Sequence, residues 1–159
     1  MRYVVVALVL AVAITVSSCS DDDAREAAET DGCAAATTEA DPLVGPLEVQ
    51  AVSSSDVEAW ALVFNTWPHE AGDILRMPAD LEIKIVWRVT GDGDLEISAI
   101  GPDGQTISPH WGPESHGGSS WRRPGDEWGT GWIFPEAGCW SFLLGRGDAT
   151  ATLTADVIT

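Results

Sequence analysis

The sequence LEIKIVWRV at residues 81–89 gives the clearest structural signal in the chain. Apolar side chains occupy every second position, Glu82, Lys84 and Arg88 lie between them, and only Val86 breaks the alternation. Successive side chains of a β-strand point to opposite faces, so a period of two is typical of a strand with one buried face. The pattern therefore predicts a half-buried strand over residues 81–89.

Further strand signals lie on both sides of this stretch, separated by turns rich in glycine and proline. Apolar or alternating runs occupy residues 47–52, 58–67, 95–99, 105–111, 128–134, 139–144 and 149–158. The turn sequence GDGD at residues 91–94 predicts a hairpin between the runs at 81–89 and 95–99. Seven or eight short strands without a convincing amphipathic helix predict an all-β domain, an antiparallel β-sandwich over residues 43–159.

Two features of these strands carry a family resemblance. Trp87 on a central strand and Cys139 on a late strand resemble the core tryptophan and cysteine of the immunoglobulin-like fold, which implies an immunoglobulin-like sandwich. The immunoglobulin spacing is broken, because no cysteine lies on the early strands. The motif FPEAGCW at residues 134–140 also resembles the C-terminal end of small secreted or lipid-anchored bacterial proteins of unsettled function. That resemblance implies no activity.

Residues 1–18 have the pattern of a bacterial export signal. Arg2 precedes an apolar run at residues 3–16, which is shorter than the about 20 residues that a membrane-spanning helix needs. The sequence VSSC at residues 16–19 resembles the lipobox of bacterial lipoproteins. This resemblance implies cleavage before Cys19, lipidation of Cys19, and attachment to the bacterial cell membrane outside the cytoplasm. The alternative is an ordinary cleaved signal peptide followed by a chance cysteine.

Residues 19–42 are predicted to form a disordered, acidic linker between the lipid anchor and the domain. From residue 20 onward the segment holds no aromatic residue and no aliphatic residue larger than alanine. Such a composition cannot bury enough apolar surface to offset the entropy of ordering. The whole chain has a formal net charge of −17 and a single lysine, Lys84. Because nucleic-acid binding needs clustered lysine and arginine side chains, no nucleic-acid partner is expected.

The cysteines predict one disulfide bond. With Cys19 lipidated, Cys33 and Cys139 remain as an even pair in an oxidising compartment. We expect them to pair and to fasten the end of the linker against the last hairpin. Closing a loop of about one hundred residues contributes roughly 4 to 5 kcal/mol in the chain-entropy model. The alternative is a buried free thiol at Cys139 and an unpaired Cys33.

Residues 110–131 form the most irregular and aromatic part of the domain, which predicts a long shaped loop displayed on the sandwich. Three tryptophans of this segment and the one that directly follows it are candidates for an aromatic binding platform: Trp111, Trp121, Trp128 and Trp132. Exposed indole rings stack on sugars and bind cations or apolar rings. The alternative is that the four rings fold inward and give the loop a small core of its own.

Polar residues of the same segment suggest two kinds of reactive site. His110, Glu114, His116 and Glu127 are residue types that bind zinc, but their spacing matches no established zinc site. Glu114 and Glu127 would suit a glycosidase if a cleft held their carboxyl groups about 5 to 9.5 Å apart. Hydrogen bonds that order the loop are the simpler role for all four residues. The sequence therefore predicts no catalytic residue, no metal and no cofactor.

The charged residues of this segment also suggest an ion pair with a structural role. Arg122 and Arg123 lie three to five residues before Asp126 and Glu127. In a tight loop, an arginine at this spacing could hold one of the acids through two parallel hydrogen bonds.

Together these patterns predict a lipid-anchored extracytoplasmic binding or interaction module. Residues 110–131 are its expected working surface, and a glycan, a peptide or a protein of the cell envelope is the expected partner. The first alternative is a structural lipoprotein of the envelope without a discrete ligand. A metal-dependent enzyme is the second alternative.

Overall fold

The computed structural model describes residues 33–38, 46–53, 57–64 and 72–159. The predicted signal peptide, Cys19 and most of the predicted linker lie outside these residues. The described residues belong to one compact unit that spans Cys33–Thr159. They contain eleven β-strands and no helix, so the all-β prediction is confirmed. None of them belongs to a helix that could span a membrane.

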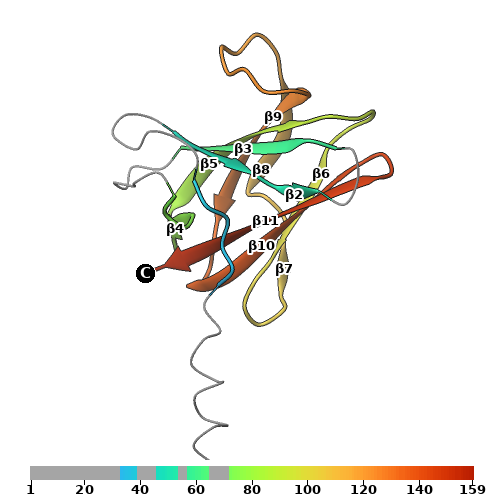
Figure 1. Cartoon of the computed structure of the whole chain (residues 1–159). Coiled ribbons are helices and arrows are strands. Elements are labelled where there is room, and N and C mark those ends of the chain that lie inside the picture. Colours follow the sequence, from blue (N-terminus) through green and yellow to red (C-terminus); the bar gives the residue numbers. More distant parts are fainter. Residues whose placement is uncertain (1–32, 39–45, 54–56, 65–71) are drawn as a thin grey trace, which may run out of the picture. The chain divides into compact units, whose positions relative to one another are not determined.

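The strands form two sheets that pack as a sandwich (Figure 1). The five-stranded sheet has the order β1 (Leu47–Gln50), β3 (Ala59–Phe64), β5 (Glu82–Val89), β9 (Asp126–Ile133) and β8 (Trp111–His116). The six-stranded sheet has the order β2 (Val52–Ser53), β11 (Ala149–Ile158), β10 (Gly138–Arg146), β6 (Glu96–Ile100) and β7 (Thr106–Ile107), and β4 (Arg76–Pro78) pairs with β11. Neighbouring strands are antiparallel except β4 and β11, which are parallel.

Alternating side chains of both sheets meet in one core. On β5, Ile83, Ile85, Trp87 and Val89 are all buried, as the period of two predicts. Five large aromatic rings form the centre of this core, with neighbouring ring centroids 5.0 to 6.3 Å apart: Trp87, Trp132, Phe134, Trp140 and Phe142. Edge-to-face and offset contacts of this kind stabilise a core beyond the area that the rings bury. The predicted antiparallel β-sandwich is confirmed, and its architecture is consistent with an immunoglobulin-like fold.

A buried threonine satisfies the polar edges of two of these rings. Trp87 and Trp132 each donate an indole N–H to Oγ1 of Thr130, at 2.8 Å in both cases. The Thr130 hydroxyl in turn donates to the carbonyl oxygen of Ile85 at 3.1 Å. A hydroxyl has one donor and two acceptor positions, so Thr130 uses its full capacity without any contact to solvent.

The predicted hairpin over residues 81–99 is wrong. β5 pairs with β3 and β9 in the five-stranded sheet, whereas β6 pairs with β10 and β7 in the other sheet. The turn at residues 91–94 therefore carries the chain from one sheet to the other. Alternation identifies a strand with one buried face, but both sheets of a sandwich present such a face to the same core.

Two further boundaries differ from the predictions. The strand expected over residues 105–111 is only β7, and Trp111 begins β8 in the opposite sheet. β8 occupies much of the expected loop and pairs with β9, with an irregularity between Trp111 and Glu114. The excursion beyond the strands is therefore limited to residues 117–125. The described residues form eleven strands, whereas seven or eight were expected. The rest of this difference comes from short strands such as β4 and from the division of the run at residues 47–52.

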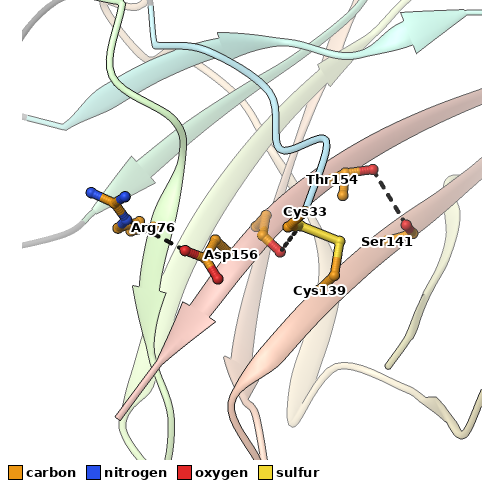
Figure 2. Close-up of a disulfide and its surroundings, with 7 residues drawn as sticks. Cys33, Arg76, Cys139, Ser141, Thr154 and Asp156 are labelled. Atoms are coloured by element: carbon orange, nitrogen blue, oxygen red, sulfur yellow. Dashed lines mark hydrogen bonds and ion pairs between the residues drawn. A yellow bond between two sulfur atoms is a disulfide. The ribbon is translucent and has the colours of Figure 1, made fainter. Parts of the chain in front are cut away.

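The disulfide between Cys33 and Cys139 is present, with the two Cα atoms 5.1 Å apart (Figure 2). Cys139 alternates with the buried Trp140, so the bond lies on the outer side of the six-stranded sheet. The immunoglobulin-like resemblance implies that Cys139 lies in the core beside Trp87. The indole ring of Trp87 packs against Phe142 instead.

Residues 33–38 lie against the sandwich, although they were predicted as part of the disordered linker. The backbone N–H of Ala36 donates to Thr154 at 2.8 Å, and Thr37 forms a β-bridge with Ile74. The compact unit therefore begins at Cys33 instead of residue 43. Composition alone underestimates the order of this segment, because the disulfide reduces the entropy that it loses on folding.

Candidate functional site

The candidate site lies on the outer face of the five-stranded sheet, the face turned away from the six-stranded sheet. On β3 the small residues Ala59, Ala61 and Val63 point into the core. The large residues Trp60, Leu62 and Phe64 alternate with them and point outward. A strand with apolar side chains on both faces must be covered on both sides or must expose apolar surface.

Val86 explains why this outer face is apolar in its centre. It pairs with Leu62 on β3 and with Gly129 on β9, and it is only 6% exposed. This residue broke the alternation of residues 81–89 in the sequence. Val86 is apolar at an outward-facing position because the loop at residues 117–125 and neighbouring side chains cover that part of the outer face.

Glycines on β9 allow the side chains of β8 to lie flat across the sheet. A Cβ atom built on Gly131 would lie 1.9 Å from Nε1 of Trp111, and one on Gly129 would lie 2.6 Å from Nε2 of His116. A Cβ at either position would force the ring of Trp111 or His116 to move, so the placement of these two rings on the sheet depends on glycine. Trp111 reaches as far as β5, where its indole N–H donates to Glu82 at 3.1 Å.

Residues 117–125 cover part of the outer face, and they are held there mainly by Glu48 of β1. Arg123 forms an ion pair with Glu48 and lies over the ring of Trp60, with its guanidinium carbon 3.6 Å from the ring centroid. The indole N–H of Trp121 donates to the same carboxylate at 2.5 Å. The loop is therefore fastened to β1 and β3 by one carboxylate and one aromatic ring.

The pKa of Glu48 reflects these contacts. Burial by itself raises the pKa of this carboxyl group, but the hydrogen bonds from Arg123 and Trp121 and the charge of Arg123 together hold the pKa below its ordinary value of 4.5. The loop contacts therefore stabilise the ionised form of Glu48.

A second charge network, centred on Glu127 and Arg88, also holds the loop at residues 117–125. Glu127 is 5% exposed and accepts hydrogen bonds from Arg88 at 3.0 Å and from the hydroxyl group of Ser119 at 2.5 Å. Arg88 also donates to the backbone carbonyl oxygens of Arg123 and Gly125. Each buried charge thus has an opposite charge and further hydrogen bonds, as buried charges require.

These pairings correct the ion pairs expected from sequence. Arg123 binds Glu48 instead of a neighbouring acid, Glu127 binds Arg88, and Asp126 pairs with Arg146 across the sandwich. Sequence spacing suggested local partners, whereas the true partners come from strands that are distant in the chain.

The loop and the sheet enclose a pocket of about 250 Å³. Its apolar lining consists of Leu62, Phe64, Val86 and Trp121. Its polar lining consists of Lys84, His116, Ser119, Ser120 and Glu127. Lys84 lies over the ring of Phe64, with its ammonium nitrogen 5.2 Å from the centroid. Apolar walls with a few converging polar groups are the usual composition of small-molecule sites.

The predicted tryptophan platform is divided by the fold. Trp111 and Trp121 are partly exposed on the outer face, and Trp121 lines the pocket. Trp128 and Trp132 belong to the core, and their rings are 5% and 0% exposed. Two of the four rings are therefore partly exposed, as a binding platform requires, and the other two fold into the core, as the alternative predicts.

The predicted metal and carboxylate candidates are not gathered into one reactive centre. His110 and Glu114 are exposed, and His116 lies at the rim of the pocket. Among the described residues, no three histidine, cysteine or acidic side chains converge as metal ligands would. Glu127 is committed to Arg88 and Ser119, so its carboxylate already has a structural role.

Six residues that line the pocket were not predicted as site residues: Leu62, Phe64, Lys84, Val86, Ser119 and Ser120. Glu48 and Arg88, which hold the loop, were not predicted either. The only local signal was the apolar character of both faces of β3, together with Val86. The sequence matches no protein-family model and has no significant similarity to a curated protein.

Proposed function

We propose that this protein is a lipid-anchored extracytoplasmic binding module whose ligand site is the pocket on the outer face of the five-stranded sheet. The observation that carries the proposal is the combination of an aromatic wall, polar groups and a loop fixed by two partly buried charge networks. A fixed loop supports a binding role, because little side-chain and loop entropy remains to be lost when a ligand binds.

The size of the pocket limits the ligand. Pockets for drug-sized molecules usually measure about 300–1,000 Å³, and this one is about 250 Å³. It fits a single ring, either of a small molecule or as one unit of a glycan or peptide. A larger hollow of about 410 Å³ between β6, β10 and β11 has no aromatic side chain in its lining, so it is a poorer candidate.

Two sequence features support the export and anchoring parts of the proposal. The VSSC motif at residues 16–19 supports lipidation at Cys19. The Cys33–Cys139 disulfide supports an oxidising compartment, because such bonds are rare in the cytosol.

A structural envelope protein without a ligand is the second candidate. It is favoured by the indole N–H groups of Trp111 and Trp121, both of which already have carboxylate partners. In that case the rings of the outer face act only as a second small core under residues 117–125.

NMR of the indole N–H groups distinguishes the two candidates. During titration with a panel of mono- and disaccharides and aromatic acids, we expect the Trp121 signal to shift and the signals of Trp87 and Trp132 to stay fixed. Trp121→Phe, which keeps an aromatic wall but loses the bond to Glu48, serves as the assignment control. If no compound moves the Trp121 signal, the binding function is wrong and the structural role is supported.

A further inference from the structure

Positive charge is distributed unevenly over this acidic domain. Two of the eight lysine and arginine residues, Arg2 and Arg25, lie outside the described part, which leaves six. Of those six, four lie on the outer face of the five-stranded sheet or in the loop above it: Lys84, Arg88, Arg122 and Arg123. In a chain with a net charge of −17, most of the described positive charge is therefore gathered on one face.

Most of this positive charge is neutralised within the protein. Arg88 is paired with Glu127, and Arg123 is paired with Glu48. Lys84 differs from them, because it forms no ion pair with any described residue. It is the only lysine of the chain, it is exposed, and it lines the pocket. An ammonium group at this position is available for a ligand.

The same contacts argue against a cationic ligand. An aromatic pocket with a carboxylate could in general bind a cation through the ring faces. Here Lys84 already lies over Phe64, Arg88 lies 5.9 Å from the centroid of Trp121, and the carboxylate of Glu127 is paired. The sites where a ligand cation would bind are occupied by cations of the protein.

We propose that the pocket binds a six-membered ring that carries a carboxylate, with Lys84 as its counter-ion. The proposal rests on the binding function above and names its ligand class. The ring packs against the apolar lining of the pocket, and the carboxylate accepts a charge-assisted hydrogen bond from Lys84 and a hydrogen bond from Ser120. The chemistry is shared by acidic sugars such as hexuronates and by aromatic carboxylates.

Matched pairs of ligands test the proposal. Glucuronate and benzoate are titrated at low ionic strength, each against a neutral counterpart of the same size, glucuronamide and benzamide, with NMR of Trp121 as the readout. We expect at least one anion to bind about tenfold more tightly than its neutral partner. We also expect this preference to shrink in salt, because the screening length falls from about 30 Å at 0.01 M to about 10 Å at 0.1 M. Binding of only one anion identifies the sugar or the aromatic source.

Lys84→Met keeps the aliphatic stem over Phe64 and removes the charge. We expect this variant to bind anionic and neutral ligands equally, with an unchanged melting temperature. Arg76→Gln on β4 removes the same charge from the other sheet and should keep the preference.

Equal binding of anionic and neutral rings by the wild type would overturn the carboxylate proposal and leave the binding function intact. A preference that survives in Lys84→Met would overturn it as well. If no ring compound binds, both the proposal and the binding function fail.

Discussion

At the scale of single residues, polar side chains with several hydrogen-bond partners stabilise both the core and the loop that lines the pocket. Thr130 accepts hydrogen bonds from two buried indoles and donates one to a carbonyl oxygen. Glu48 accepts hydrogen bonds from Arg123 and Trp121 and fastens the loop. In each case one side chain satisfies at least two polar groups, so its removal leaves several polar atoms without a partner.

Thr130→Val tests this dependence in the core. Valine has nearly the same shape, but it leaves the indole N–H groups of Trp87 and Trp132 unsatisfied, each at a cost of about 1–3 kcal/mol. We therefore expect a loss of roughly 2 to 6 kcal/mol in the free energy of unfolding, measured by urea titration. Thr152→Val, at an exposed position of β11, should change stability by less than about 0.5 kcal/mol. Equal losses in the two variants would contradict the role of Thr130.

At the scale of elements, the loop at residues 117–125 depends on a strand that is far away in sequence. Trp121 and Arg123 have no strand pairing of their own, and β1 provides the carboxylate that holds them. β1 is an edge strand of its sheet. The shape of the pocket is therefore set by a contact between an edge strand and a loop.

This contact should weaken in acid. Because the folded state lowers the pKa of Glu48, the contribution of Glu48 to stability is present above its unfolded pKa of about 4.5 and is lost as the pH falls through the lower folded value. We expect the Trp121 indole signal to move toward its solvent-exposed position as the pH falls below 4.5, before the core signals of Trp87 and Trp132 change.

Glu48→Gln separates this carboxylate from general acid effects. The variant should show a released Trp121 signal already at pH 7 and a much smaller response to acid. Glu96→Gln on the six-stranded sheet removes the same charge and should behave as the wild type does. An unchanged acid response in Glu48→Gln would mean that another group holds the loop.

At the scale of the whole molecule, the disulfide fastens Cys33, the first described residue, to β10 (Figure 2). The pocket lies on the outer face of the five-stranded sheet, whereas Cys139 lies on the outer side of the six-stranded sheet. Cys33 and the pocket therefore lie on opposite sides of the sandwich.

The anchor itself is tested with Cys19→Ala. Two or more acyl chains give stable membrane attachment at about 0.8 kcal/mol for each buried methylene. We expect the variant to lose detergent-phase partitioning and membrane retention. The melting temperature of the purified sandwich domain should match that of the wild type, because Cys19 lies outside the compact unit. Retention of the variant on the membrane would refute lipidation at this cysteine.

The sequence alone determined the class of the fold and its main strands. Alternation at residues 81–89 identified the buried face of β5 correctly except at Leu81, which precedes the strand and is exposed. The run at residues 149–158 coincides with β11. The even number of remaining cysteines identified the disulfide. Side-chain alternation is a local property and the number of cysteines is a count, so neither depends on which strands are neighbours.

Only the tertiary structure decided which strands share a sheet and which side chains share a pocket. The turn at residues 91–94 links two sheets, Arg123 reaches β1, and Trp121 separates from Trp128 although both belong to one aromatic segment. The physical reason is that periodicity records the direction of a side chain relative to its neighbours in the same strand. It does not record the partner strand, and the partner strand determines both the ion pairs and the lining of the pocket.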